Sequence, residues 1–179
     1  MTSNSDLAAL VRTIHDHPRP GIAFRDISTL MLDGDAFAET VRRMAALHDG
    51  MVPDRIAAIE ARGFVFGSAL AHRFSCGLVM LRKPGKLPGA ASGIDYALEY
   101  GTDRLEMHDG AVEPGMKVTL VDDLVATGGT ALAALALLRG AGAEVTHASF
   151  VIDLPDLGGS AALREAGVEP RALIEFGGA

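Results

Sequence analysis

The residues that most clearly suggest a chemical role are two adjacent carboxylates, Asp122 and Asp123, followed by a short loop rich in Thr and Gly. The nearly continuous apolar run from Lys117 to Asp122 predicts a buried strand, and open α/β sheets bind ligands at the carboxyl ends of their strands. The loop, residues 124–129, leads into a predicted helix from Thr130, whose free N–H groups and positive dipole end favour a bound phosphate. Carboxylates that can accept hydrogen bonds from hydroxyls, beside a phosphate loop, predict a sugar-phosphate site.

Other interpretations of this stretch stay open at the level of the residues. Thr130 and the glycines before it can simply cap the helix while the two acids are solvated. Neighbouring side chains of a regular strand point to opposite faces, so both acids reach one sugar only if the strand has ended at Asp122. The loop lacks the Lys of a Walker A sequence, which argues against an NTPase.

A second group of charged residues, Arg82, Lys83 and Lys86, is interleaved with Pro and Gly in one loop. It is the densest positive cluster in an acidic chain, which has 16 basic against 23 acidic residues and a formal net charge of −7. That net charge argues against a general nucleic-acid binder, so a small anionic substrate has to be captured by local positive potential. The other interpretation of the cluster is a solvated loop.

The composition is that of one folded domain. The 179 residues are 49% hydrophobic and 22% charged, which excludes a disordered or fibrous chain. The longest apolar run, residues 131–138, is far shorter than the roughly 20 residues that cross a bilayer. The first six residues do not resemble a signal peptide, and the single Cys76 cannot form an intrachain disulfide. We therefore expect a cytoplasmic protein that binds neither membrane nor nucleic acid.

The predicted elements alternate between strands and helices, which indicates an α/β fold with a mostly parallel central sheet flanked by helices. Apolar periodicity predicts helices at about 6–15, 35–48, 64–74 and 130–139. Apolar runs predict strands at 55–60, 77–81, 117–122, 144–153 and 171–176. Alternating apolar residues from Tyr96 to Met107 predict a hairpin that forms a flap on one side of the sheet.

Residues 121–130 resemble the phosphoribosyl-pyrophosphate signature of the type I phosphoribosyltransferases. Four further blocks, in order along nearly the whole chain, resemble the adenine-specific branch of that family: residues 20–27, 60–67, 82–88 and 98–101. The resemblance implies a single domain over residues 1–179 with the type I fold, a β-hairpin flap and a small N-terminal hood. The hood, residues 1–34, would contribute to the base pocket.

The activity that the resemblance implies is transfer of the 5-phosphoribosyl group from phosphoribosyl pyrophosphate to N9 of adenine. The products would be AMP and pyrophosphate, and the cofactor Mg²⁺. Mg²⁺ is expected to bind mainly through substrate oxygens and water, with no direct protein ligand but with Asp122 or Asp123 nearby. In related enzymes residues of the basic loop can reach a neighbouring subunit's site, which implies a homodimer.

The resemblance also assigns roles to the matching residues. Asp122 and Asp123 would hold the ribose hydroxyls, and the 5′-phosphate would lie on Ala126, Thr127, Gly128, Gly129 and Thr130. Arg62 would act in catalysis by contacting pyrophosphate, in a loop where family members often hold a cis non-proline peptide; a surface ion pair is its other interpretation. Further substrate contacts are implied for Arg82, Lys83, Lys86 and Tyr100.

The base pocket implied by the resemblance is the segment Ala23, Phe24 and Arg25, largely through backbone groups. A backbone C=O that accepts from the 6-amino group, with an N–H that donates to N1, would select adenine over a 6-oxo purine. In the other interpretation, Phe24 is a core residue and Arg25 and Asp26 form a surface pair. For Asp26 we favour this second interpretation.

Two alternatives to this activity remain. One is a regulator that binds phosphoribosyl pyrophosphate without catalysis, and the other is a related enzyme that uses another base. Glu99, Arg62 and the basic loop favour catalysis, since a sensor needs no group that handles a proton.

Glu99 gives a first testable prediction. A carboxylate near the base can take the N9 proton or stabilise the charge that develops as the bond to pyrophosphate breaks. We expect Glu99→Gln mainly to lower kcat in steady-state turnover with adenine. An unchanged kcat would remove Glu99 from the mechanism and favour its other interpretation, an outward-facing residue on an exposed flap.

Overall fold

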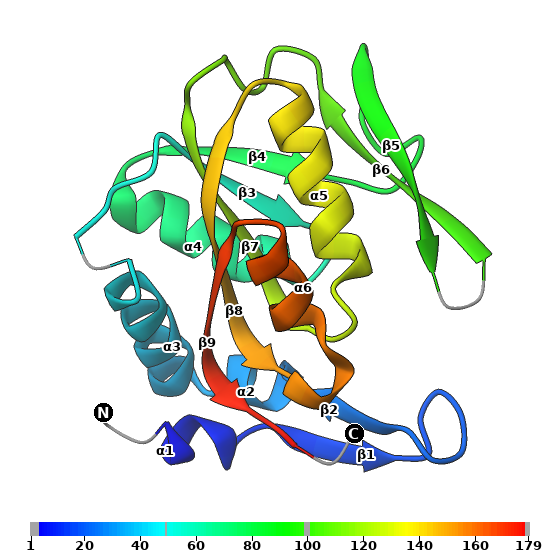
Figure 1. Cartoon of the computed structure of the whole chain (residues 1–179). Coiled ribbons are helices and arrows are strands. Elements are labelled where there is room, and N and C mark those ends of the chain that lie inside the picture. Colours follow the sequence, from blue (N-terminus) through cyan, green and yellow to red (C-terminus); the bar gives the residue numbers. More distant parts are fainter. Residues whose placement is uncertain (1–3, 49, 99–100, 178–179) are drawn as a thin grey trace.

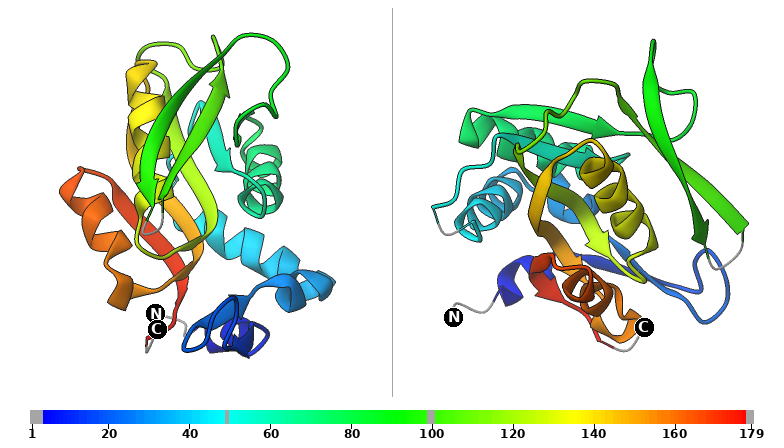
Figure 2. Two further views of the ribbon diagram at one scale, coloured as in Figure 1. Left: turned by 90° about the vertical axis from the view of Figure 1, so that its right-hand side faces the viewer. Right: turned by 45° about the horizontal axis from the view of Figure 1, so that its top comes forward.

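The computed structural model describes residues 4–48, 50–98 and 101–177, and its centre is a five-stranded parallel sheet (Figure 1). The strand order is β4-β3-β7-β8-β9, with bounds Gly77–Leu81, Arg55–Ile59, Lys117–Val125, Glu144–Asp153 and Glu169–Glu175. One face is covered by α3 (Gly34–Ala46) and α4 (Gly63–Phe74), and the other by α5 (Gly129–Gly140) and α6 (Gly159–Glu165) (Figure 2). The predicted α/β class is therefore confirmed.

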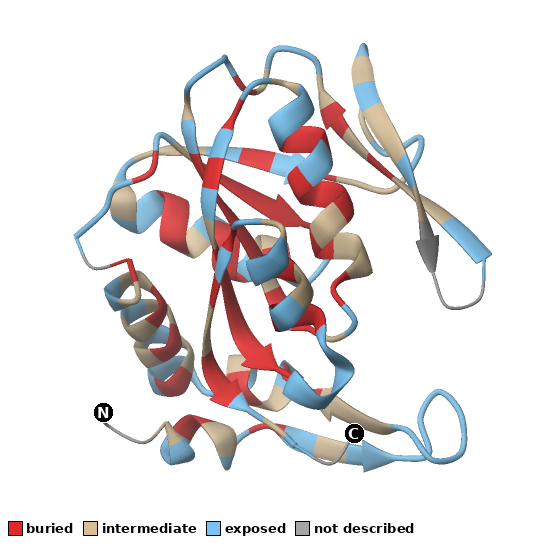
Figure 3. Cartoon of the chain, viewed as in Figure 1, coloured by how far each residue is buried: buried red, intermediate tan, exposed pale blue. Residues whose placement is uncertain are grey.

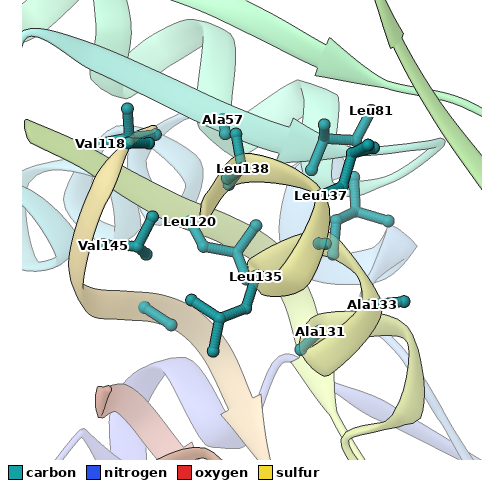
Figure 4. Packing of buried hydrophobic residues seen from close by; sticks show 14 of the residues in the cluster. Ala57, Leu81, Val118, Leu120, Ala131, Ala133, Leu135, Leu137, Leu138 and Val145 are labelled. Carbon is teal, nitrogen blue, oxygen red and sulfur yellow. The ribbon is translucent and has the colours of Figure 1, made fainter. Parts of the chain in front are cut away.

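The strands form nearly continuous apolar runs because both of their faces are covered. Residues 56–59 of β3 are all buried (Figure 3). Ile56 packs with the α4 side of the sheet and Ala57 with the α5 side, since successive side chains of a strand point to opposite faces. Figure 4 shows the α5 side, where Leu120 of β7 and Leu135 of α5 belong to one buried cluster. Within the described residues, no helix has the length and apolar character needed to cross a membrane.

The N-terminal hood lies beside the carboxyl ends of β8 and β9 (Figure 1). Its elements are α1 (Ser5–Ala8), the antiparallel strands β1 (Arg12–His15) and β2 (Ala23–Asp26), and α2 (Ser28–Leu32).

The prediction of one helix over about residues 6–15 is wrong, because α1 ends at Ala8 and β1 follows it. Arg12 lies directly opposite Asp26 in the β1–β2 ladder, and the two side chains form a salt bridge. This tertiary contact outweighs the helical spacing of the apolar residues, which is only a weak local preference.

Most other predicted elements are present with shifted ends. The strands at 77–81 and 144–153 coincide with β4 and β8, while β7 continues past its predicted end at Asp122 to Val125. The elements without a prediction, β2, α2 and α6, have 4, 5 and 7 residues, which is too short for a periodic pattern to stand out.

The predicted flap is the hairpin of β5 (Ala91–Leu98) and β6 (Gly101–His108), which lies beside α5 (Figure 1). It begins at Ala91 rather than Tyr96, so the small residues before Tyr96 are part of a strand. An isolated antiparallel bridge joins Arg82 to Glu106 and so connects the basic loop to the flap.

The salt bridge of the hood gives a pH-dependent prediction. Hydrogen bonds from Ser28 and then from Arg12 lower the pKa of Asp26 to about 2. Since this pKa lies below the value of about 3.9 in an unfolded chain, the carboxylate stabilises the fold above pH 4, and the effect is lost as the pH falls toward 2. We expect Asp26→Asn to lower the free energy of unfolding by about 1–2 kcal/mol at pH 7 in urea titrations. A loss of the same size at pH 3 and pH 7 would contradict this account.

Candidate active site

Strand β7 carries the two acids to the edge of a cavity because its neighbours pair with it over different lengths. Its pairing with β3 ends at Val121, whereas its pairing with β8 continues to Val125. The β3 side of the strand is therefore open beyond Val121, and a cavity of about 340 Å³ lies there. Its lining comes from β3, the loop before α4, the basic loop, β7 and the start of α5: Ile59, Glu60, Ala61, Arg62, Lys83, Asp122, Asp123, Leu124 and Thr130.

Both acids line this cavity although the strand does not end at Asp122. The register of β7 with β8 runs without interruption from Thr119 to Val125, so the strand is regular at the two acids. The cavity lies along the open edge of β7 rather than on one face of it, so side chains that point to either face can border it.

Asp122 is half-buried and lies directly against the start of α4. Burial, and then the negative charge of Asp123, raise the pKa of Asp122 well above its ordinary value. The backbone N–H of Asp123 donates to Oδ1 of Asp122 at 2.9 Å, which opposes that effect. A Cβ on Gly63, the first residue of α4, would come within 2.6 Å of the same Oδ1. Glycine at this position therefore lets the helix begin directly against the carboxylate.

Arg62 connects the acids to the hood. Its Nε lies 2.5 Å from Oδ2 of Asp123, whose side chain is only 8% exposed. Its guanidinium carbon lies 5.5 Å from the centroid of the Phe24 ring in β2. The preceding Glu60–Ala61 peptide bond is cis, as the resemblance led us to expect. Arg62 is thus in an ion pair, but its partner is an acid of the cavity.

The predicted phosphate loop forms a second cavity of about 120 Å³ next to the first. Residues 124–131 and Asp122 line it, so the two cavities share Asp122, Leu124 and Thr130. The start of α6 supports the loop, since the N–H of Gly159 donates to the carbonyl oxygen of Ala126 at 2.9 Å. A group bound on the loop would therefore lie next to the acids.

Gly159 was not among the predicted site residues. A Cβ at this position would lie 2.3 Å from the carbonyl oxygen of Ala126 and 2.7 Å from the nitrogen of Gly128. Its sequence signal is the Gly-Gly pair at 158–159, after the short 3₁₀ turn Pro155–Leu157. Nothing in the sequence shows that this pair contacts the phosphate loop.

Glu60 anchors the basic loop. Its Oε2 accepts from Nε of Arg82 at 3.1 Å and from the backbone N–H of Lys83 at 2.9 Å. Arg82 also donates from Nη1 to the carbonyl oxygen of Lys86 at 2.9 Å. Of the three cations, Lys83 lines the larger cavity, Arg82 shapes the loop, and Lys86 is exposed.

The side chain of Arg25 is held by one residue of the hood and by Phe176. The guanidinium donates to Oγ1 of Thr13 at 2.6 Å and stacks 4.4 Å from the ring centroid of Phe176. The expected surface pair of Arg25 and Asp26 is wrong, because neighbours on a strand point to opposite faces and Asp26 is buried against Arg12.

Two predicted site residues, Glu99 and Tyr100, lie outside the described residues, and their roles stay predictions. The structure gathers most of the other candidates around the two connected cavities. The exceptions are Arg82 and Lys86 of the basic loop and the segment Ala23–Arg25, of which Phe24 contacts Arg62 of the larger cavity.

Comparison with known proteins identifies the family to which this arrangement belongs. A family model described as a phosphoribosyl transferase domain matches residues 29–159. The chain is 62% identical to the adenine phosphoribosyltransferase of Sphingopyxis alaskensis over 97% of its own length and 94% of that protein. The chain belongs to the adenine phosphoribosyltransferase family.

Solved structures of this family agree with the fold. The adenine phosphoribosyltransferase of Thermoanaerobacter pseudethanolicus superimposes with a TM-score of 0.91 at 42% identity, covering 96% of this chain and 99% of that one. That of Saccharomyces cerevisiae, solved in complex with adenine and an iminoaltritol bisphosphate, has a TM-score of 0.88 at 31% identity, with 95% and 97% covered. The predicted type I phosphoribosyltransferase fold is therefore confirmed.

The contact between α6 and the phosphate loop generates a prediction. In Gly159→Ala the new Cβ would push Ala126 away, so we expect the KM for phosphoribosyl pyrophosphate to rise by about tenfold or more. The KM for adenine should change little, and steady-state kinetics would measure both. The control is Gly140→Ala at the end of α5, where a Cβ meets nothing within 4 Å. Equal kinetics for the two variants would show that the loop does not depend on this contact.

Proposed function

We propose that the protein transfers the 5-phosphoribosyl group from phosphoribosyl pyrophosphate to N9 of adenine, giving AMP and pyrophosphate in purine salvage. The observation that carries the proposal is the meeting of the two acids, the phosphate loop and Arg62 around connected cavities, with Phe24 of the hood against Arg62. The family supports the same activity, as adenine is bound in the Saccharomyces cerevisiae structure.

The chain offers a separate partner for each part of the sugar substrate. The 5′-phosphate would lie on the N–H groups and hydroxyls of residues 126–130 at the start of α5, where the helix dipole favours an anion. The ribose hydroxyls would donate to Asp122 and Asp123. The pyrophosphate would lie toward Arg62 and Lys83, the cations of the larger cavity.

The chemistry consists of the exchange of one bond at C1′. The bond from C1′ to the pyrophosphate oxygen breaks and leaves a ribosyl group with oxocarbenium character, which the N9 lone pair of adenine attacks. Cations on the pyrophosphate stabilise the leaving group, and the nearby carboxylates stabilise the positive sugar. N9 loses its proton as it attacks, and Glu99 remains the proposed acceptor.

Adenine would be read by the backbone of the segment Ala23–Arg25. The Arg25 guanidinium is held by Thr13 and Phe176, which supports recognition through main-chain groups of this segment rather than through that side chain. The Phe24 ring provides an apolar face beside Arg62, suitable for stacking a flat base.

Mg²⁺ is part of the proposal. Asp122 and Asp123 provide the oxygen ligands that Mg²⁺ prefers, but Asp122 is packed against the start of α4 and Asp123 is paired with Arg62. Within the described ranges no group of three or more His, Cys, Asp or Glu side chains is arranged to hold a metal ion. This donor set fits an ion held mainly by substrate oxygens and water, with the two acids nearby. When bound, it would neutralise charge on the pyrophosphate.

We further propose a homodimer in the cytoplasm. Partly exposed apolar side chains lie near the β4 edge of the sheet: Val65 is 40% exposed, Leu78 36% and Met80 41%. A second copy that covered them would remove this apolar surface from water. Lys86, exposed on the adjacent loop, would be available to a neighbouring site. A reducing compartment suits a chain whose only cysteine is Cys76.

The decisive assay is base-dependent release of pyrophosphate from phosphoribosyl pyrophosphate and Mg²⁺, with adenine, guanine, hypoxanthine and orotate offered in parallel. We expect kcat/KM for adenine to exceed that for each other base by about 10³-fold or more, since a 6-oxo group leaves buried partners unpaired. The Arg62→Ala variant, prepared in the same way, gives the background rate of pyrophosphate release.

Each other outcome points to one alternative. Turnover with a different base would support the residues assigned to the phosphate site and contradict those assigned to the base pocket. Tight binding of phosphoribosyl pyrophosphate without any turnover would indicate a sensor.

A further inference from the structure

Lys83, one of the two cations in the lining of the larger cavity, is engaged by the flap. Nζ of Lys83 donates to the hydroxyl of Tyr96 at 2.9 Å and forms a salt bridge with Asp103. The hydrogen bond from Lys83 is the largest of the causes that lower the pKa of Asp103 below its ordinary value, so this carboxylate is ionised at neutral pH.

The hairpin is built to present these two side chains together. Tyr96 of β5 and Asp103 of β6 lie directly opposite each other in the antiparallel ladder, so both side chains project from the same face. The Tyr96 hydroxyl donates to Oδ2 of Asp103 at 3.2 Å and accepts from Oγ1 of Thr130 at 3.4 Å. We name Lys83, Tyr96, Asp103 and Thr130 the flap latch, because they connect the flap to both cavities.

This arrangement conflicts with a bound pyrophosphate. Lys83 and Thr130 belong to the lining of the larger cavity, where the leaving group would lie. A carboxylate that contacts Lys83 occupies one side of the ammonium and repels an incoming anion. The side chains of Lys83 and Asp103 are 34% and 27% exposed, so the exchange of one anion for another is not prevented by burial.

We propose that Asp103 competes with the pyrophosphate group for Lys83, and that binding of phosphoribosyl pyrophosphate opens the flap latch by replacing the carboxylate with a phosphate oxygen. The inference rests on the proposed function, whose site it deepens. Asp103 thereby sets the affinity for the anionic substrate and product. No covalent step is involved.

The test is Asp103→Asn, which removes the charge and keeps the shape. We expect the dissociation constant of Mg²⁺-pyrophosphate, measured by calorimetry, and the KM for phosphoribosyl pyrophosphate each to fall about threefold, the size expected for a partly exposed ion pair. The KM for adenine should stay unchanged.

Asp95→Asn is the matched control. Asp95 precedes Tyr96 on β5, pairs with Arg104 at 3.1 Å and has a 73% exposed side chain. The substitution removes the same charge from the flap but not from a partner of Lys83, so we expect both constants to equal those of the wild type. In a Lys83→Met background the effect of Asp103→Asn should disappear, because the two residues then have no contact to lose.

The outcomes separate this proposal from the proposed function. Weaker or unchanged pyrophosphate binding in Asp103→Asn would overturn the competition, and so would an equal gain in Asp95→Asn or a gain that persists without Lys83. Calorimetry does not need turnover. If the protein showed no turnover with adenine but Asp103→Asn still bound pyrophosphate about threefold more tightly, the proposed function would be wrong and the competition for Lys83 would stand.

Discussion

The unequal pairing of β7 with its two neighbours is the constraint on which the site depends. Because β3 pairs with β7 only as far as Val121 while β8 continues to Val125, the strand stays fixed along one edge and is open along the other. The open edge makes the larger cavity, and the fixed edge holds the loop that makes the smaller one. A strand released by both neighbours would leave the acids on a mobile loop, and a strand paired on both sides would bury them in the sheet.

Charge around the site is balanced by ion pairs between neighbouring segments. Arg62 is paired with Asp123, Lys83 with Asp103, and Arg82 with Glu60. Each pair joins different segments of the chain, so the hood-facing loop, the flap and the basic loop are all held by ionic contacts. In a protein of net charge −7, this explains how cations can be kept at one place without a large positive surface. For Lys83, the proposed exchange of the Asp103 carboxylate for a phosphate oxygen would use one of these pairs.

Close backbone approach is the second requirement of the site. Gly63 lets α4 begin against Asp122, and Gly159 lets α6 begin against Ala126. Both contacts place the start of a helix against the end of β7, one from each face of the sheet. The carboxylates and the phosphate loop are thus fixed by packing from both layers, and their geometry follows from the core that holds those layers together.

The sequence by itself determined the α/β class, strands such as β4 and β8, and the order of acids, threonines and glycines that gives β7 and its loop their chemistry, because these depend on local composition and spacing. Only the tertiary structure decided that Arg12–His15 is a strand, that Asp26 pairs with Arg12, and that Asp103 reaches Lys83. These contacts join residues far apart in the chain, and in β1 one of them outweighs a helical pattern. Periodicity reports which face of an element is apolar, whereas the partner of a charged side chain depends on which segments the fold brings together.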